Sequence, residues 1–167
     1  IESVGYELYC SLLESAVRSL TKQPAKPLFD CSVELSWRAY LPKDYVPGPR
    51  VKLELYRRLA RLRTLPHLAD FRQELIDRFG PLGRPAENLL AEAELRILAG
   101  NWKLERIHRE AEYAVLTYRN ASRIEALAKR HKGKVRVVDA KRAYIPLGED
   151  PLKPSEVAEI LRNLLKA

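Results

Sequence analysis

Residues 67–83 read HLADFRQELIDRFGPLG, and this stretch decides how the middle of the chain is organised. Apolar side chains recur in it at helical spacing, which predicts an amphipathic helix over His67–Phe79. Gly80 and Pro81 end that helix, because glycine adopts the left-handed conformation of a helix C-cap and proline cannot continue a helix. We expect five apolar residues of this helix to lie in the core: Leu68, Phe71, Leu75, Ile76 and Phe79.

Three carboxylates share the other face of the same helix. Asp70, Glu74 and Asp77 are spaced four and three residues apart, so they form one acidic stripe. Most such stripes only face water, and Glu74 would then form an i,i+4 pair with Arg78 worth roughly 0.2–0.5 kcal/mol. The alternative is a docking surface for Arg or Lys side chains of a partner. Acid–base catalysis is not indicated, since nothing nearby predicts the burial that raises a carboxyl pKa.

The elements predicted on either side of this helix include both strands and helices. Upstream, alternating apolar and polar residues over Cys31–Leu41 predict a half-buried strand, and a helix follows over Arg50–Leu62. Downstream, a third helix covers Pro85–Ala99 and ends at Gly100. Four short stretches rich in Val, Ile and Tyr then predict strands at 103–108, 113–118, 135–138 and 143–147, with a short helix at 122–129 and a last helix from Pro154.

The order of these elements predicts the fold class. It runs as one strand, three helices, four strands with one short helix inserted, and a final helix. Strands segregated from helices in this way indicate an α+β fold with an antiparallel sheet rather than a βαβ fold. Ser122 and Glu125 have capping-box spacing and mark the start of the inserted helix.

The chain divides into three parts. Residues 1–21 predict an amphipathic helix, which we interpret as a linking helix from an upstream domain, and 22–30 form a proline-containing linker. Residues 31–167 are then a C-terminal regulatory or interaction domain. Because the chain starts with Ile and contains no Met, we expect it to be a fragment of a longer protein.

The composition favours a cytoplasmic protein with an acidic partner. No apolar run approaches the roughly 18–20 residues that cross a bilayer, and no signal peptide is evident. The net charge is +8, and most of it lies in one segment where seven bases meet a single acid, Asp139. We call these bases the basic cluster and treat them as candidate nucleic-acid contacts: Lys129, Arg130, Lys132, Lys134, Arg136, Lys141 and Arg142.

Catalytic and cofactor motifs are absent from the sequence. The only Gly-Lys pair, Gly133-Lys134, is followed by Val135 where a phosphate-binding loop requires Ser or Thr. No GxSxG elbow is present, and the three histidines and two cysteines show no metal-ligand spacing. We therefore expect no catalytic residue, no metal and no cofactor in this chain, which is not an enzyme by itself.

Four motifs resemble one known family. SVGYELYCSLLESAV at 3–17, AYLPKDYVPGPRVKLELYRRLA at 39–60, QELIDRFGPL at 73–82 and ENLL at 87–90 closely resemble the C-terminal (TRCF) domain of bacterial transcription-repair coupling factors. The resemblance is strong up to about Gly100 and weak beyond, and the motifs are long and gapless enough to be specific. The basic cluster lies outside the four motifs that carry this resemblance.

The resemblance implies a function in DNA repair. The parent protein would be a cytoplasmic ATP-dependent DNA translocase that binds RNA polymerase, duplex DNA and the UvrA component of nucleotide excision repair. ATP and Mg would bind its motor domain, outside this chain. The end domain would fold back on a UvrB-like module of the same parent and mask the surface that UvrA binds, with Glu74 and Asp77 facing basic side chains of that module.

Two functional hypotheses follow from the sequence. The first is an autoinhibitory protein-interaction domain that uses the acidic stripe. The second is a nucleic-acid-binding module that uses the basic cluster.

Overall fold

The computed structural model describes residues 31–148 and 152–166. The predicted linking helix and linker at 1–30 lie outside the described residues. The described residues form two compact units, which we call the helical unit (38–93) and the sheet unit (31–37 together with the described part of 94–166).

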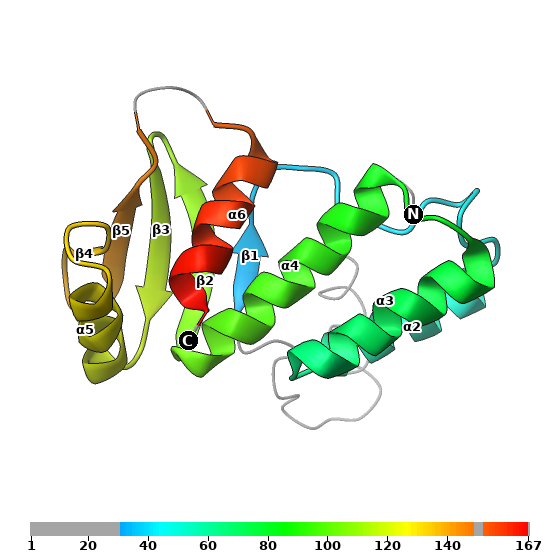
Figure 1. Ribbon diagram of the computed structural model, residues 1–167, viewed down its shortest axis with the longest axis horizontal. Helices are drawn as coiled ribbons and strands as arrows, with labels where there is room; N and C mark the ends of the chain where they lie inside the picture. Colours follow the sequence, from blue (N-terminus) through cyan, green and yellow to red (C-terminus); the bar gives the residue numbers. More distant parts are fainter. Residues whose placement is uncertain (1–30, 149–151, 167) are drawn as a thin grey trace, which may run out of the picture. The chain divides into compact units, whose positions relative to one another are not determined.

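The helical unit is built from α2 (Pro49–Arg61), α3 (Leu65–Phe79) and the first part of α4 (Arg84–Asn101). Figure 1 shows α2 and α3 lying side by side. Pro49 opens α2, where its missing N–H leaves no hydrogen bond unmade. Leu55, Leu59 and Leu75 are almost completely buried and form the centre of this unit. All three helices were predicted to within two residues of their bounds.

Local signals set both ends of α3. Thr64 caps its start and accepts a hydrogen bond from the backbone N–H of His67 at 3.4 Å. At its end Gly80 has φ +89°, a conformation that favours glycine, and its N–H donates to the carbonyl of Ile76 at 2.9 Å. The Tyr45 hydroxyl donates at this end too, lying 3.1 Å from the Leu75 carbonyl and 2.9 Å from that of Gly80. The predicted Gly-Pro stop is thus confirmed.

The predicted core of α3 is only partly correct. Leu68, Phe71 and Leu75 are buried, whereas Ile76 and Phe79 are half-buried. Phe79 stands in the last turn, where its ring contacts the Tyr45 ring at 5.8 Å and the Arg78 guanidinium at 5.0 Å. Its exposure follows from that terminal position, because fewer elements surround the end of a helix.

The sheet unit contains five strands in the order β1-β2-β3-β5-β4. They are β1 (Ser32–Glu34), β2 (Leu104–Glu110), β3 (Tyr113–Tyr118), β4 (Arg136–Val137) and β5 (Arg142–Pro146). Neighbours pair antiparallel except β1 and β2, which are parallel, so the sheet is mixed. The predicted α+β class and element order are confirmed, whereas the prediction of an antiparallel sheet is wrong for β1, whose parallel pairing depends on a strand far away in the sequence.

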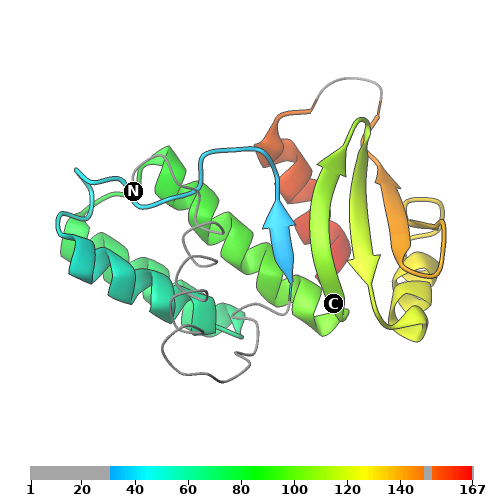
Figure 2. The ribbon, with the colours of Figure 1, turned by 180° about the vertical axis from the view of Figure 1, so that it is seen from behind.

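Helix α6 (Pro154–Leu165) lies over one face of this sheet (Figures 1 and 2). Ile107, Leu116 and Ala143 occupy register positions across β2, β3 and β5, and each is completely buried. Trp102, directly after α4, donates its indole N–H to the Leu165 carbonyl at 2.8 Å, which fixes the end of α6 to the end of α4. The remaining helix, α5 (Ala121–Arg130), buries Ile124 and Leu127.

Three local predictions were wrong. The strand predicted over Cys31–Leu41 ends at Glu34, because Ser36 adopts φ +58° and turns the chain. Alternating burial continues past that point without strand pairing, so periodicity alone overestimated the strand. Helix α4 passes Gly100 and ends at Asn101. Helix α5 is capped by Asn120, whose side chain accepts a hydrogen bond from the Arg123 N–H at 3.0 Å, and not by the predicted capping box of Ser122 and Glu125.

Candidate interaction surfaces

The acidic stripe lies on the solvent side of α3. Packing of Leu68, Phe71 and Leu75 into the helical unit turns the opposite face of the helix outward. Asp70 and Asp77 are exposed, and the Glu74 side chain keeps 30% of its surface accessible. The structure therefore brings the three predicted carboxylates to one surface, as their spacing indicated.

Glu74 is already paired within the helical unit. Its carboxylate accepts two hydrogen bonds from Arg58 of α2, at 2.7 and 2.5 Å, and a third from Arg78 at 2.8 Å. The pKa of Glu74 is lowered from its ordinary value of 4.5 to about 2, first by the hydrogen bonds from Arg58 and also by the hydrogen bond from Arg78, while burial opposes this shift. Glu74 is thus a charged link between α2 and α3, with most of its acceptor positions in use.

Asp77 and Asp70 are in a different state. Asp77 accepts one hydrogen bond from the side-chain amide of Gln73 at 2.8 Å, and this neutral donor leaves its negative charge uncompensated. Among the described residues, neither Asp77 nor Asp70 forms an ion pair. These two carboxylates are free to meet a cation from outside the chain.

A second ion pair fixes the other flank of α3. Arg72 donates to both carboxylate oxygens of Glu87 in α4, at 2.7 and 2.6 Å. Arg58 and Arg72 thus join α3 to its two neighbouring helices through bidentate pairs. The sequence did not reveal either partner, because each pair depends on how two helices are aligned rather than on spacing within one helix.

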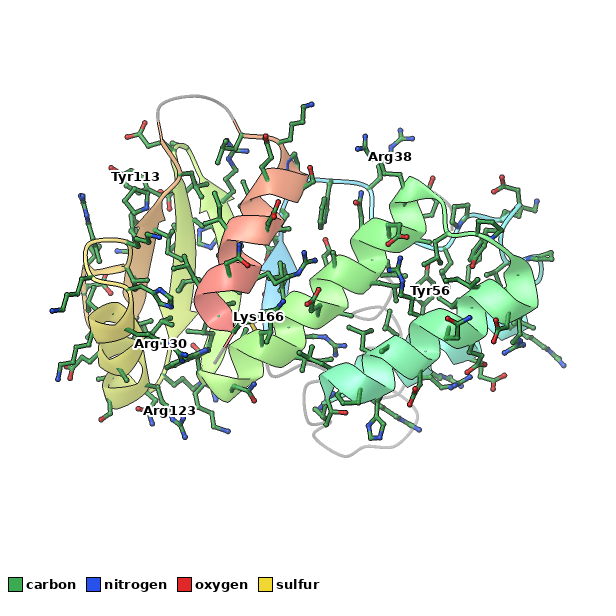
Figure 3. The ribbon with its side chains drawn as sticks, viewed as in Figure 1. Arg38, Tyr56, Tyr113, Arg123, Arg130 and Lys166 are labelled. Carbon is green, nitrogen blue, oxygen red and sulfur yellow. The ribbon has the colours of Figure 1, made fainter. Side chains whose placement is uncertain are left out.

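The basic cluster lies at the β4 edge of the sheet unit. Lys129 and Arg130 end α5, and Lys132 and Lys134 flank a turn at Gly133. Arg136 is in β4, while Lys141 and Arg142 lead into β5. All seven side chains are exposed. Figure 3 labels Arg130 at α5. The fold therefore gathers the whole cluster on one side of the sheet unit.

The single acid of that segment compensates only one of the bases. Asp139 accepts from the backbone N–H groups of Lys141 and Arg142 and from the Arg142 guanidinium, each at 2.8 Å. The bond from the Lys141 N–H, followed by that from the guanidinium, lowers the pKa of Asp139. The other six bases form no ion pair with any residue that the structure describes.

No metal or membrane feature emerges from the described part of the chain. It contains no group of three His, Cys, Asp or Glu side chains placed to bind a metal ion. His67 lies on α3, His108 on β2 and His131 directly after α5, and the thiol of Cys31 is buried. None of its helices combines the length and apolar character required to span a bilayer.

Comparison with known proteins points to one family. The family model of the TRCF domain matches residues 35–128. Transcription-repair-coupling factors of Staphylococcus epidermidis and Haemophilus influenzae are 38% and 37% identical over 101 and 113 residues, 59% and 64% of this chain. That of Bacillus subtilis is 29% identical over 118 residues, or 70% of the chain.

The chain spans only 9–10% of the length of these relatives. Its fold is similar to the crystal structure of the C-terminal domain of a transcription-repair coupling factor, with a TM-score of 0.60 and 18% identity. That match covers 82% of this chain and 88% of the solved one. Both units contribute to the matched region.

Proposed function

This chain belongs to the TRCF domain family of transcription-repair coupling factors, and from that premise we propose that it is an autoinhibitory protein-interaction domain. It would cover the UvrA-binding surface of a UvrB-like module in the same parent protein. The parent would be a cytoplasmic, ATP-dependent DNA translocase that also binds RNA polymerase and duplex DNA. ATP and Mg would serve its motor domain, while this chain contributes binding rather than catalysis.

The observation that supports masking is the charge state of α3. Asp70 and Asp77 present two uncompensated carboxylates on one exposed helix face, in a chain whose net charge is +8. An acidic patch on a basic domain favours docking against Arg or Lys of a partner. The positive charges elsewhere on the domain repel those basic side chains, so other orientations of the partner are disfavoured. The α2 and α4 ion pairs hold the helix that presents these carboxylates.

The carboxylates have different roles in this proposal. Asp77 is the principal contact, because its charge is unpaired within the described residues. Glu74 acts mainly by neutralising Arg58 and Arg78, which would otherwise repel an incoming base. Losing one partner of a desolvated ion pair costs roughly 2–5 kcal/mol and losing an exposed pair about 0–1 kcal/mol, so the mask requires a largely desolvated contact.

UvrA binding by the full-length parent tests this proposal. The variant Asp70→Asn plus Asp77→Asn is expected to bind UvrA more tightly than the unmodified parent, because the mask opens. Glu125→Gln plus Glu159→Gln is the matched control, since it removes two exposed carboxylates from the sheet unit. Unchanged UvrA affinity in the Asp70 and Asp77 variant would rule out masking by these residues.

The basic cluster supports a second function, nucleic-acid binding. Six exposed bases without an ion pair among the described residues form a surface to which phosphates would be attracted. We expect the 167-residue chain to bind a 15-base-pair DNA duplex, and the affinity to fall as salt rises. If duplex binding is undetectable at 50 mM salt, the chain does not bind double-stranded DNA through this cluster.

A further inference from the structure

The sheet has a second face, opposite α6. Because successive strand residues point to opposite faces, the neighbours of the buried Ile107, Leu116 and Ala143 point away from that helix. Cross-strand register places His108, Val115, Tyr144 and Arg136 in one row across β2, β3, β5 and β4. Figure 2 views the sheet unit from this side, and no described helix of that unit crosses in front of the strands.

Two tyrosines form the centre of this open face. Tyr113 of β3 and Tyr144 of β5 are half-buried, with ring centroids 5.4 Å apart and ring planes inclined at 51°. Val115, next to both, is completely buried although no helix of the unit covers it. The surrounding side chains therefore shield Val115 themselves and form an aromatic layer whose outer surface is still in contact with solvent.

The basic cluster borders this aromatic layer on one side only. Arg136 lies directly opposite Tyr144, and residues paired in this way have Cβ atoms about 4.5–5.5 Å apart. On the far side, Glu34 forms a bidentate pair with Arg106, and Glu110 lies 3.7 Å from the His108 imidazole. Positive charge is thus concentrated along the β4 side of the tyrosines.

The segments that carry these bases are anchored to the core. Val135 is buried between Lys134 and Arg136, and Ala143 is buried after Arg142. Tyr118 donates its hydroxyl to the Asp139 carbonyl at 2.6 Å and its N–H to the Lys141 carbonyl at 2.9 Å. A ligand would meet a preformed arrangement of charges, which reduces the entropy lost on binding.

Local structure explains only part of the cluster. Lys129 and Arg130 stand in the last turn of α5, where cations complement the helix dipole. Lys132, Lys134, Arg136 and Lys141 have no such local role and no carboxylate partner among the described residues. Val137 and Val138 are large apolar side chains that remain exposed beside these four bases, and they add apolar surface to the same edge.

We propose that this face binds single-stranded nucleic acid, with bases stacked on Tyr144 and Tyr113 and phosphates held by Lys132, Lys134, Arg136 and Lys141. The proposal rests on the second proposed function and specifies the form of the ligand. Aromatic rings beside a basic track are the combination that single-strand binders use, because unpaired bases offer their flat faces for stacking. A duplex hides those faces within its own stack, so it would engage the bases of the cluster without the tyrosines.

The test measures fluorescence anisotropy of the 167-residue chain with a labelled 15-nucleotide oligothymidine, the 15-base-pair duplex and a labelled polyglutamate peptide. We expect oligothymidine to bind most tightly. Tyr144→Leu keeps an apolar cover over Val115 and should weaken oligothymidine binding roughly 5- to 150-fold while leaving duplex binding unchanged. Tyr40→Leu, in the helical unit, is the matched control, and Tyr113→Leu is a second variant on the same face if Tyr144→Leu unfolds.

Charge variants distinguish single-strand binding on the tyrosines from the more general binding of nucleic acid by the basic cluster, on which this inference rests. Lys132→Gln, Lys134→Gln, Arg136→Gln and Lys141→Gln together should weaken both nucleic acids. The control with the same net charge replaces four exposed bases of the helical unit: Lys43→Gln, Arg50→Gln, Arg57→Gln and Arg61→Gln. With four phosphate contacts on single-stranded DNA, raising salt from 50 to 200 mM should reduce affinity by a factor on the order of 50.

Three other outcomes would each overturn the single-strand site. If the four-base variant loses binding but the tyrosine variants bind oligothymidine normally, stacking is wrong and nucleic-acid binding through the cluster stands. If neither oligothymidine nor the duplex binds, the single-strand site and the nucleic-acid function of the basic cluster are both wrong. If only polyglutamate binds and the four-base variant abolishes it, the surface recognises an acidic protein segment instead.

Discussion

Arg58 of α2 donates two hydrogen bonds to the two carboxylate oxygens of Glu74 in α3, from Nη1 at 2.7 Å and from Nη2 at 2.5 Å. The same arginine lies over the Phe71 ring, 5.5 Å from its centroid. One side chain thus connects the exposed surface of α3 with the apolar side that faces the core. Arg58 therefore couples the acidic stripe to the packing of the helical unit.

Replacing Glu74 with Gln should lower the free energy of unfolding by about 0.5–1 kcal/mol, because Arg58 and Arg78 lose their shared anion in a partly exposed setting. Urea denaturation at pH 7 measures the change. Glu125→Gln, which removes an exposed carboxylate without an ion pair among the described residues, should shift stability by much less. Equal shifts in the two variants would mean that the pair does not stabilise the fold.

The stabilising effect of Glu74 should depend on pH. Its pKa in the folded chain, about 2, lies below its ordinary value of 4.5, so the folded state binds the proton less readily than the unfolded state. The contribution is therefore complete above about pH 4.5 and is lost as pH falls towards 2. Unfolding curves of the wild-type chain and Glu74→Gln should converge across that window, and a difference that stays constant down to about pH 2 would contradict this assignment.

Replacing Asp139 with Asn should strengthen nucleic-acid binding. Asparagine can still accept hydrogen bonds from the backbone N–H groups of Lys141 and Arg142, but it no longer neutralises the Arg142 guanidinium. One more base then becomes available to phosphates, so the slope of log affinity against log salt for a duplex should steepen by about 0.9. Anisotropy titrations at several salt concentrations measure this slope, and Asp44→Asn provides an exposed control in the helical unit.

Replacing Gly80 and Gly100 with alanine should change the stability of the chain in opposite directions. Gly80 has φ +89° and open space where a Cβ would stand, so Gly80→Ala strains only the backbone and should destabilise the chain by about 1–2 kcal/mol. Gly100 lies inside α4 with equal space around it, and Gly100→Ala should stabilise by up to about 1 kcal/mol. The melting temperatures of both variants test these expectations. An unchanged melting temperature for Gly80→Ala would exclude a conformational role for that glycine.

The sequence predicted best what local signals control. Helix periodicity and the Gly80-Pro81 stop placed α3 within two residues, and β3 was predicted at Tyr113–Tyr118 as observed. Spacing alone also placed the acidic stripe on one helix face. These features depend on residues that are close in the chain.

Features that depend on distant residues could not be predicted. Neither the parallel pairing of β1 nor the position of β5 between β3 and β4 is encoded in a single segment. The i,i+4 partner of Glu74, Arg78, was predicted, but its bidentate partner Arg58 comes from another helix, and the Tyr113–Tyr144 contact comes from two strands separated by α5 and β4. The charge pattern indicated the basic cluster, but only the register of the sheet revealed the tyrosines beside it.

The parallel pairing of β1 with β2 has a consequence for how the chain folds. Ser32 pairs with Arg106 and Glu34 with His108, so in sequence the whole helical unit is inserted between two neighbouring strands of one sheet. During synthesis, the local contacts of α2 and α3 become available long before β2 leaves the ribosome, whereas pairing of β1 requires closure of a long loop. We expect the helices to form first, and a chain truncated before β2 would leave the buried Val33 without Ile107, its partner in the parallel pairing.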